Sequence, residues 1–149
     1  MNKLITSTQN AYIKELVLLK EKSRNRKKTG QFLIEGFREI SLAIKGGYTI
    51  ETLIIDTSIV DNQFVELIIS EIKSAVEIIE VSKEVYKKIA LRETTEGIIA
   101  ISKTKELSIE NFRLTSKNPL ILVAEAPEKP GNIGALLRTA DAAGIDAVF

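Results

Sequence analysis

The chain has 149 residues, of which 44% are hydrophobic and 28% charged, the balance of an ordinary folded protein. It contains neither cysteine nor histidine, which excludes disulfides, thiolate or imidazole metal ligands, and catalysis by a Cys–His pair or a Ser-His-Asp triad. No apolar run approaches the roughly 20 residues that a membrane-spanning helix needs, so we expect no membrane partner and a cytoplasmic location.

The first predicted element is a helix over residues 9–22, because apolar residues recur there every three or four positions. We expect its inner stripe to contain Ile13, Leu16, Val17 and Lys20. Residues 1–29 hold eight basic residues against two acidic ones, a net charge of +6. Since the whole chain carries only +1, the remaining residues sum to −5.

Most of this positive charge lies in one basic cluster, which permits two interpretations. Cations grouped over so short a stretch neutralise nucleic-acid phosphates. They also stabilise the carboxyl end of a solvated helix, where the helix dipole is negative. If the cluster binds RNA, its contact residues are Lys22, Arg24, Arg26, Lys27 and Lys28.

Strands and helices alternate over the following residues. Strands are predicted at residues 32–34, 50–55, 76–81 and 97–101, where apolar and β-branched residues gather. A helix through Phe37, Ile40 and Ile44 follows the first strand and ends at Gly46-Gly47. The alternation predicts a three-layer α/β domain over residues 1–101, and the polar stretch at residues 102–118 is predicted to be a linker.

Two further helices are predicted between the later strands. Asp61 is a suitable N-cap for the first, whose apolar face would consist of Phe64, Val65, Ile68 and Ile72. Ser82 would cap the second, a short helix through Val85 and Ile89. The loop at residues 92–96 is polar, and it either only connects two elements or also contacts RNA.

The last predicted element group is a strand, a turn, a helix and a second strand. Residues 120–124 are an apolar run typical of a buried strand, and Asn132 is a candidate N-cap for the helix that follows. Gly144 is placed to end this helix, and residues 146–149 begin an extended run. The apolar stripe of the helix would consist of Ile133, Leu136, Leu137 and Ala140.

A turn of this kind can present backbone N–H groups to an anion, with Arg138 adding a charged fork for phosphate or ribose oxygens. The alternative is an ordinary surface unit in which Asn132 caps the helix and Arg138 pairs with Asp141. No complete G-x-G-x-x-G fingerprint is present, so spacing alone does not choose between them.

Residues 130–144 resemble the first signature motif of the SpoU (TrmH-like) RNA ribose 2′-O-methyltransferases, P-G-N-x-G-x-x-x-R-T-A-x-x-x-G, without a gap. Residues 32–40 and 96–100 are similar to the F-x-x-E-G-x-R and Q-G-x-x-A elements of the family's N-terminal domain. Glu96 stands where the family has Gln, and its carboxylate would repel phosphate.

This resemblance implies a fold and a function. The fold would be a ribosomal-protein-like substrate-binding domain followed by the truncated start, residues 119–149, of a trefoil-knot methyltransferase domain. The family transfers a methyl group from S-adenosylmethionine to a ribose 2′-hydroxyl, here most naturally of rRNA. Asn132 and Arg138 match the catalytic positions of the motif, and Arg38 becomes an RNA-contact candidate. We expect Arg138 to grip the ribose or phosphate, because a guanidinium is a poor base.

The family's later motifs, which hold the cofactor and most of a homodimer interface, have no counterpart in these residues. We therefore expect a chain that neither binds S-adenosylmethionine nor methylates by itself. We also expect residues 120–149 to cover their apolar surface by docking, swapping or dimerising. The second function hypothesis is a non-catalytic RNA-binding module in which the motif is only scaffold.

Overall fold

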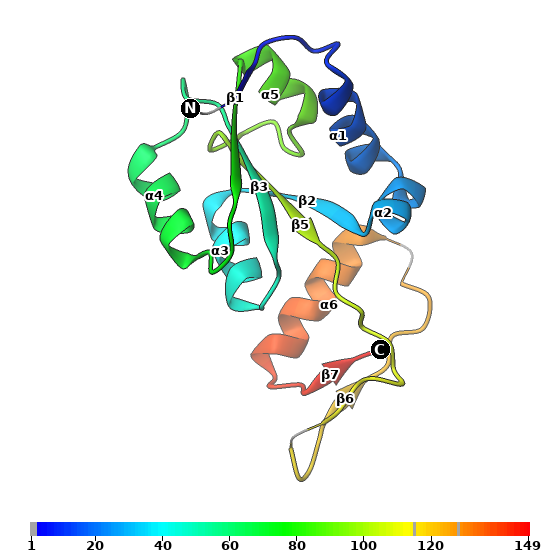
Figure 1. Ribbon diagram of the computed structural model, residues 1–149. Coiled ribbons are helices and arrows are strands. Elements are labelled where there is room, and N and C mark those ends of the chain that lie inside the picture. Colours follow the sequence, from blue (N-terminus) through cyan, green and yellow to red (C-terminus); the bar gives the residue numbers. More distant parts are fainter. Residues whose placement is uncertain (1–2, 115, 128) are drawn as a thin grey trace. The chain divides into compact units, whose positions relative to one another are not determined.

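The computed structural model describes residues 3–114, 116–127 and 129–149 (Figure 1). Thr115 of the predicted linker and Glu128 of the predicted methyltransferase fragment lie outside the described residues. The chain divides into two compact units, Met1–Lys105 and Glu106–Phe149, and each unit has a sheet of its own. No helix in the described part of the chain is long and apolar enough to cross a membrane.

A five-stranded mixed sheet forms the centre of the first unit, with strand order β1-β4-β3-β5-β2. The strands are β1 (Lys3–Ile5), β2 (Gln31–Glu35), β3 (Ile50–Ile55), β4 (Glu77–Val81) and β5 (Ile98–Lys103). The pairs β1–β4 and β4–β3 are parallel, whereas β5 is antiparallel to both β3 and β2.

The described part of this unit has five helices, of which four cover the two faces of the sheet (Figure 1). The five helices are α1 (Ala11–Glu21), α2 (Ser23–Thr29), α3 (Phe37–Lys45), α4 (Asn62–Glu71) and α5 (Lys83–Ile89). One face packs on α1 and α5 and the other on α3 and α4, so the unit has three layers.

Alternation along the central strands explains the two cores. In β3, Ile54 packs with α1 and α5, whereas Leu53 and Ile55 pack with α3 and α4. In β5, Ile99 and Ile98 divide between the two faces in the same way. Since successive side chains of a strand point to opposite faces, a sheet covered on both sides needs unbroken apolar runs of this kind. Each fully buried isoleucine contributes about 1.5–3 kcal/mol.

Most elements of the first unit agree with the sequence predictions. The structure confirms the four predicted strands and the N-caps Asp61 and Ser82, whose side chains accept hydrogen bonds from Gln63 N and Val85 N. The strand β5 runs two residues beyond its predicted end, because its antiparallel ladder with β2 continues through Ser102 and Lys103, which pair with Phe32 and Gln31.

Three details of the helices differ from prediction. Most of the basic cluster forms a separate helix, α2, which the sequence did not predict; this helix has no buried residue and carries Arg26, Lys27 and Lys28 in its last turn, so the helix-end interpretation stays open. On α1 the buried residues are Ile13, Leu16 and Leu19, so Leu19 replaces the predicted Lys20 in the inner stripe. Phe64 on α4 was placed in the apolar face, yet it is 50% exposed.

The second unit is a small β-helix-β unit. The strands β6 (Ile121–Leu122) and β7 (Ala147–Val148) are parallel and are joined by α6 (Pro130–Ala142). The predicted strand at residues 120–124 thus has only two ladder residues, although the Leu120 carbonyl accepts from Asp146 N at 2.9 Å. The ring of Phe112 packs edge-on against Phe149, with centroids 5.3 Å apart.

The helix α6 begins earlier than predicted. Its N-cap is Lys129, and Asn132 lies in the first turn, where its backbone N donates to the Lys129 carbonyl at 2.9 Å. The predicted cap at Asn132 is therefore wrong, because a proline fits the first helical position and starts the helix there. Gly144, with φ +66°, follows the helix as predicted.

The predicted apolar stripe of α6 is only partly buried. Ala140 is 5% exposed, whereas Ile133 and Leu137 are 37% and 49% exposed. The expectation that residues 120–149 cover this surface by docking, swapping or dimerising stays a prediction.

Candidate functional site

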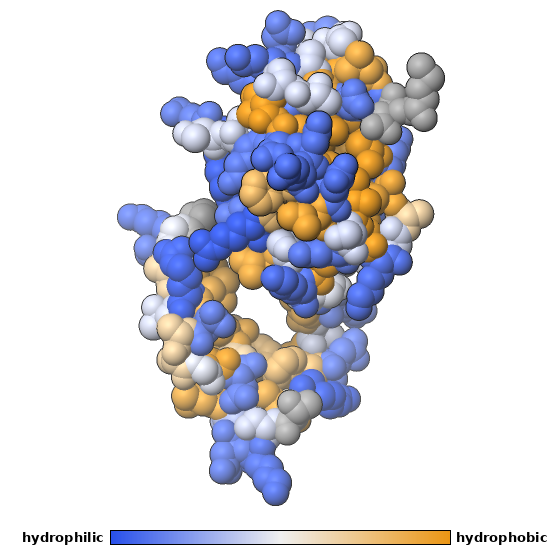
Figure 2. Space-filling model, turned by 90° about the vertical axis from the view of Figure 1, so that its left-hand side faces the viewer, coloured by the Kyte–Doolittle hydropathy of each residue, from blue (hydrophilic) through white to orange (hydrophobic). Residues whose placement is uncertain are grey.

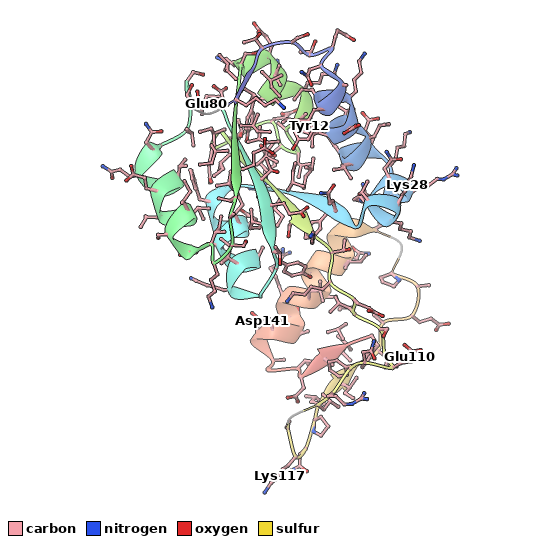
Figure 3. All side chains as sticks on the ribbon, in the orientation of Figure 1. Tyr12, Lys28, Glu80, Glu110, Lys117 and Asp141 are labelled. Atoms are coloured by element: carbon pink, nitrogen blue, oxygen red, sulfur yellow. The ribbon has the colours of Figure 1, made fainter. Side chains whose placement is uncertain are left out.

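The basic helix α2 presents its cations unequally. Arg24, Lys27 and Lys28 are exposed, and Figure 3 shows Lys28 on the outer side of α2. The guanidinium of Arg26, by contrast, donates through Nη1 to the carbonyls of Leu19 at 2.7 Å and Lys20 at 3.0 Å. Arg26 therefore closes the carboxyl end of α1, where orphan carbonyls need donors.

Lys22 joins these two helices. It is the C-cap of α1 and the N-cap of α2, with an extended backbone, and its side chain is exposed. Of the five cations predicted to contact RNA in this region, Lys22, Arg24, Lys27 and Lys28 are available to an anionic partner. Arg26 fixes the bend that presents them.

A buried glutamate anchors the other polar region of the first unit. Glu35, at the end of β2, is 3% exposed, and its Oε2 accepts from the backbone N of Leu91 at 2.6 Å and of Arg92 at 2.9 Å. Its Oε1 accepts from the hydroxyl of Tyr86 at 3.1 Å, and that hydroxyl accepts from Thr95 at 2.8 Å. The Glu35 carboxylate therefore fixes the loop after α5 to the sheet.

Burial has an electrostatic consequence at Tyr86. The desolvation of its ring and the nearby Glu35 carboxylate raise the pKa of Tyr86 well above its ordinary value of 10.0. The hydroxyl therefore stays protonated and acts as a hydrogen-bond donor to Glu35.

Gly36 makes room for a second set of polar contacts beside Glu35. Its φ is +104°, and a Cβ there would lie 2.5 Å from Oε2 of Glu39. In the space left free, Glu39 pairs with Arg92 at 2.8 Å, and Glu96 accepts from the backbone N of Phe37 at 2.7 Å. The Arg92 guanidinium lowers the pKa of the Glu39 carboxyl. Glu96, which departs from the family pattern, thus closes the start of α3.

Arg38 lies on the exposed side of α3, at a groove of about 690 Å³ between α3 and α4. This groove also holds the half-exposed Phe64 and three carboxylates, those of Asp61, Glu71 and Glu96. Figure 2 views the molecule from the side on which α4 lies and shows apolar surface interrupted by polar side chains. The structure therefore places Arg38 apart from the basic helix α2 and among acidic neighbours.

The predicted catalytic pair lies on α6. Asn132 and Arg138 are both exposed, and they stand six residues apart, about 120° around the helix. The Arg138 side chain extends back along α6, since a Cβ added to Gly134 would lie 3.9 Å from its Nη1. Among the described residues we find no ion pair between Arg138 and Asp141 and no hydrogen bond between Arg138 and Asn132.

Two features of the site were missed by sequence reasoning. The role of Arg26 as a helix cap rests on carbonyls that no side-chain pattern reveals. The lysines of α5, Lys83 and Lys87, are both exposed and four residues apart, a spacing that puts them on one face of a helix. That spacing was a usable signal.

Comparison with known proteins bears on the first unit directly. Residues 10–100, which contain α1 to α5 and most of the central sheet, match the MRM3-like substrate binding domain. The chain belongs to this family. The MRM3-like domain thus occupies most of the five-stranded unit, and the matched range includes Arg38 and the whole basic helix.

Relatives extend the likeness over the second unit. A 23S rRNA (guanosine(2553)-2'-O)-methyltransferase of Bacillus subtilis, RlmP, is 31% identical over 147 residues, which are 98% of this chain and 53% of that protein. A solved RNA 2'-O ribose methyltransferase is 40% identical, with a TM-score of 0.79, over 97% of this chain and 54% of that one.

The fold is shared more widely. The SpoU methyltransferase AviRb of Streptomyces viridochromogenes, solved in complex with AdoMet, is 23% identical with a TM-score of 0.82 and covers 94% of this chain and 52% of its own. The predicted resemblance to the SpoU family and the predicted α/β fold are confirmed. The MRM3-like chain spans about half the length of the relatives it matches.

Proposed function

We propose that this chain is part of an RNA ribose 2′-O-methyltransferase, in which the first unit binds RNA and the second supplies the first catalytic motif. The proposal depends on one observation: the same chain contains an RNA-methyltransferase type of substrate-binding domain and a second unit with the SpoU motif. An MRM3-like domain with an exposed basic helix precedes a β-helix-β unit whose helix carries Asn132 and Arg138 in SpoU register. The substrate proposed is rRNA, as named for the relative RlmP.

The chemistry assigned to Arg138 is positional. A guanidinium remains charged at any pH at which RNA is intact, so it cannot accept the proton of a ribose hydroxyl. Its planar fork suits two oxygens of a ribose or phosphate, and holding the hydroxyl in line with the methyl donor supplies much of the rate. Asn132, in the first turn of the same helix, would hold the preceding loop.

The methyl donor of the proposed reaction is S-adenosylmethionine, which solved relatives contain. We infer that residues 106–149 do not by themselves complete a site for this cofactor. This inference is supported by the exposure of Asn132 and Arg138 on α6 and by the half-exposed, apolar Leu137 on the same helix. We therefore assign no cofactor contact within residues 106–149 and derive no step through the cofactor.

The assembly and location of the whole enzyme belong to the same proposal. We propose a homodimer, completed through the methyltransferase domain, that acts in the cytoplasm. The half-exposed Ile133 and Leu137 on α6 support this, because apolar surface of this kind becomes buried in a complete domain or interface.

The experiment compares this chain with the whole protein that contains it. Each is incubated with unmodified rRNA and S-adenosylmethionine labelled in its methyl group. We expect label in RNA from the whole protein only, and loss of that label in its Arg138→Ala variant. The matched control is Arg113→Ala, since Arg113 is an exposed arginine of the same unit outside the motif.

A specific observation favours a second candidate, a non-catalytic RNA-binding module. The exposed cations of the chain concentrate on the first unit, which has a complete two-sided core. If the whole protein transfers no label yet retains rRNA on a filter, the binding module replaces the enzyme.

A further inference from the structure

A second groove of the first unit, the α1–α5 groove, is lined mainly by α5 and the loop that follows it, with Lys20 as its one residue from α1, and it differs in charge from the α3–α4 groove. Its volume is about 720 Å³, and its lining includes four cations, Lys20, Lys83, Lys87 and Arg92, against the single carboxylate of Glu93. The α3–α4 groove has the opposite balance, with Arg38 among three carboxylates. The two grooves therefore attract different partners, and the α1–α5 groove attracts anions.

The fold holds the four cations in place. The apolar side of α5 packs into the core through Val85, Tyr86 and Ile89. Lys83 and Lys87 therefore lie together on the exposed side of this helix. Lys20 is half-buried in the last turn of α1, and its Nζ donates to the Lys88 carbonyl at 3.4 Å.

Arg92 is fixed from two directions. Its backbone N donates to the buried Glu35, and its guanidinium pairs with Glu39. These two contacts restrict the loop after α5 before any partner binds. Arg92 would therefore lose little conformational freedom when an anion binds in the groove.

The groove suits a phosphate backbone better than bases. Tyr86, the aromatic residue in its lining, is 1% exposed, and its hydroxyl is engaged with Glu35 and Thr95, so the ring offers no face for stacking. Single-stranded bases need such an aromatic platform. The exposed Lys83, Lys87 and Arg92, spaced along a concave surface, in contrast match the spaced charges of a sugar–phosphate chain.

We propose that the α1–α5 groove binds the sugar–phosphate backbone of the substrate RNA, with Lys83, Lys87 and Arg92 on phosphates. This proposal rests on the proposed function, because RNA is the partner there. Lys20 links the groove to the basic helix α2, since its carbonyl accepts from Arg26 at the point where α2 leaves α1. The exposed Arg24, Lys27 and Lys28 of α2 are further cations of the same unit.

The test measures binding of a fluorescein-labelled RNA hairpin by fluorescence anisotropy over a series of salt concentrations. The double variant Lys83→Gln, Lys87→Gln is compared with the double variant Lys45→Gln, Lys73→Gln. All four lysines are exposed, and both variants lose the same charge. Lys45 ends α3 and Lys73 follows α4, on the opposite face of the sheet.

At about 0.1 M salt we expect the groove variant to bind about tenfold more weakly than the unaltered chain. The slope of the logarithm of its binding constant against the logarithm of the salt concentration should be less steep by about 1.5. The control variant should stay within about twofold of the unaltered chain, because only its long-range charge is lost. If both variants bound the hairpin equally weakly, the groove proposal would be refuted, since binding would then depend on net charge alone.

The same measurements separate this proposal from the function on which it rests. If the groove variant binds the hairpin more weakly than the control variant does, but the whole protein never methylates rRNA, the groove proposal is supported and the proposed enzyme function is refuted. If the whole protein methylates rRNA and its groove variant keeps the same KM for rRNA, the enzyme stands and the groove is refuted. The circular dichroism of each variant should match that of the unaltered chain.

Discussion

The buried carboxylate of Glu35 gives the sharpest test of how the first unit holds its polar loop. Replacing it by Ala removes the acceptor of two backbone N–H groups and of the Tyr86 hydroxyl, at 2.6, 2.9 and 3.1 Å. A hydrogen bond to a charged group contributes about 1.5–3 kcal/mol, and donors left without an acceptor in a buried place cost more. The three contacts are coupled, so we expect Glu35→Ala to lower the free energy of unfolding by about 3–5 kcal/mol.

Tyrosine fluorescence during urea unfolding is the suitable assay. The chain has no tryptophan, and its three tyrosines, Tyr12, Tyr48 and Tyr86, all lie in the first unit, so the signal reports on that unit alone. Since the free energy of unfolding of a domain of this size is about 5–15 kcal/mol, the expected loss is large and readily measured.

Two controls locate the origin of the Glu35 effect. Glu35→Gln keeps an oxygen for Leu91 N and Arg92 N but loses the charge, and should cost only about 1–2 kcal/mol. Glu66→Ala removes an exposed glutamate of α4 and should change the free energy of unfolding by less than about 0.5 kcal/mol. A loss below about 1 kcal/mol in Glu35→Ala would refute the reasoning, because the loop would then not depend on this carboxylate.

Three further predictions follow from other contacts. Arg26→Ala should lower the free energy of unfolding by about 1–3 kcal/mol in the same urea assay, because the last carbonyls of α1 lose their donor, whereas Lys27→Ala should have little effect. Because the folded pKa of Tyr86 is raised above the unfolded value of 10.0, the unfolded chain loses this proton first, and stability should fall as pH rises above about 10. Tyr86→Phe should reduce the steepness of that fall by up to about 1.4 kcal/mol per pH unit, and an unchanged slope would contradict it. Gly97→Ala should cost about 2 kcal/mol or more in thermal unfolding, because φ is +76° and the new Cβ would lie 2.9 Å from the backbone N of Val60; a neutral result would show that this backbone can shift.

Local patterns were sufficient for most helices and strands of the first unit. The apolar run of β3 and the caps Asp61 and Ser82 lie where the sequence places them, and α3 ends at Gly46 as predicted. These features depend on residues within a few positions of one another, so they can be read from the chain. The SpoU motif belongs with them, because it is contiguous.

Short or unburied elements gave no such signal. The strand β1 has three residues, of which only Ile5 is buried, and it exists because β4 pairs with it. The helix α2 has no buried residue, so its pattern is not periodic. Asn132 was misplaced as a cap because a preceding proline and an asparagine are both acceptable helix starts, and the sequence does not rank them.

The sequence by itself determined the family, the layered α/β fold and the identity of the candidate catalytic residues Asn132 and Arg138. Only the tertiary structure decided that Glu35 anchors a loop more than fifty residues away, and that Arg26 caps a helix. It also decided that Lys20 and Lys83 line one groove. The reason is physical: helix periodicity and capping act between neighbours in the chain, whereas a buried acceptor or a cationic groove is made by groups that only the packing of the sheet brings together.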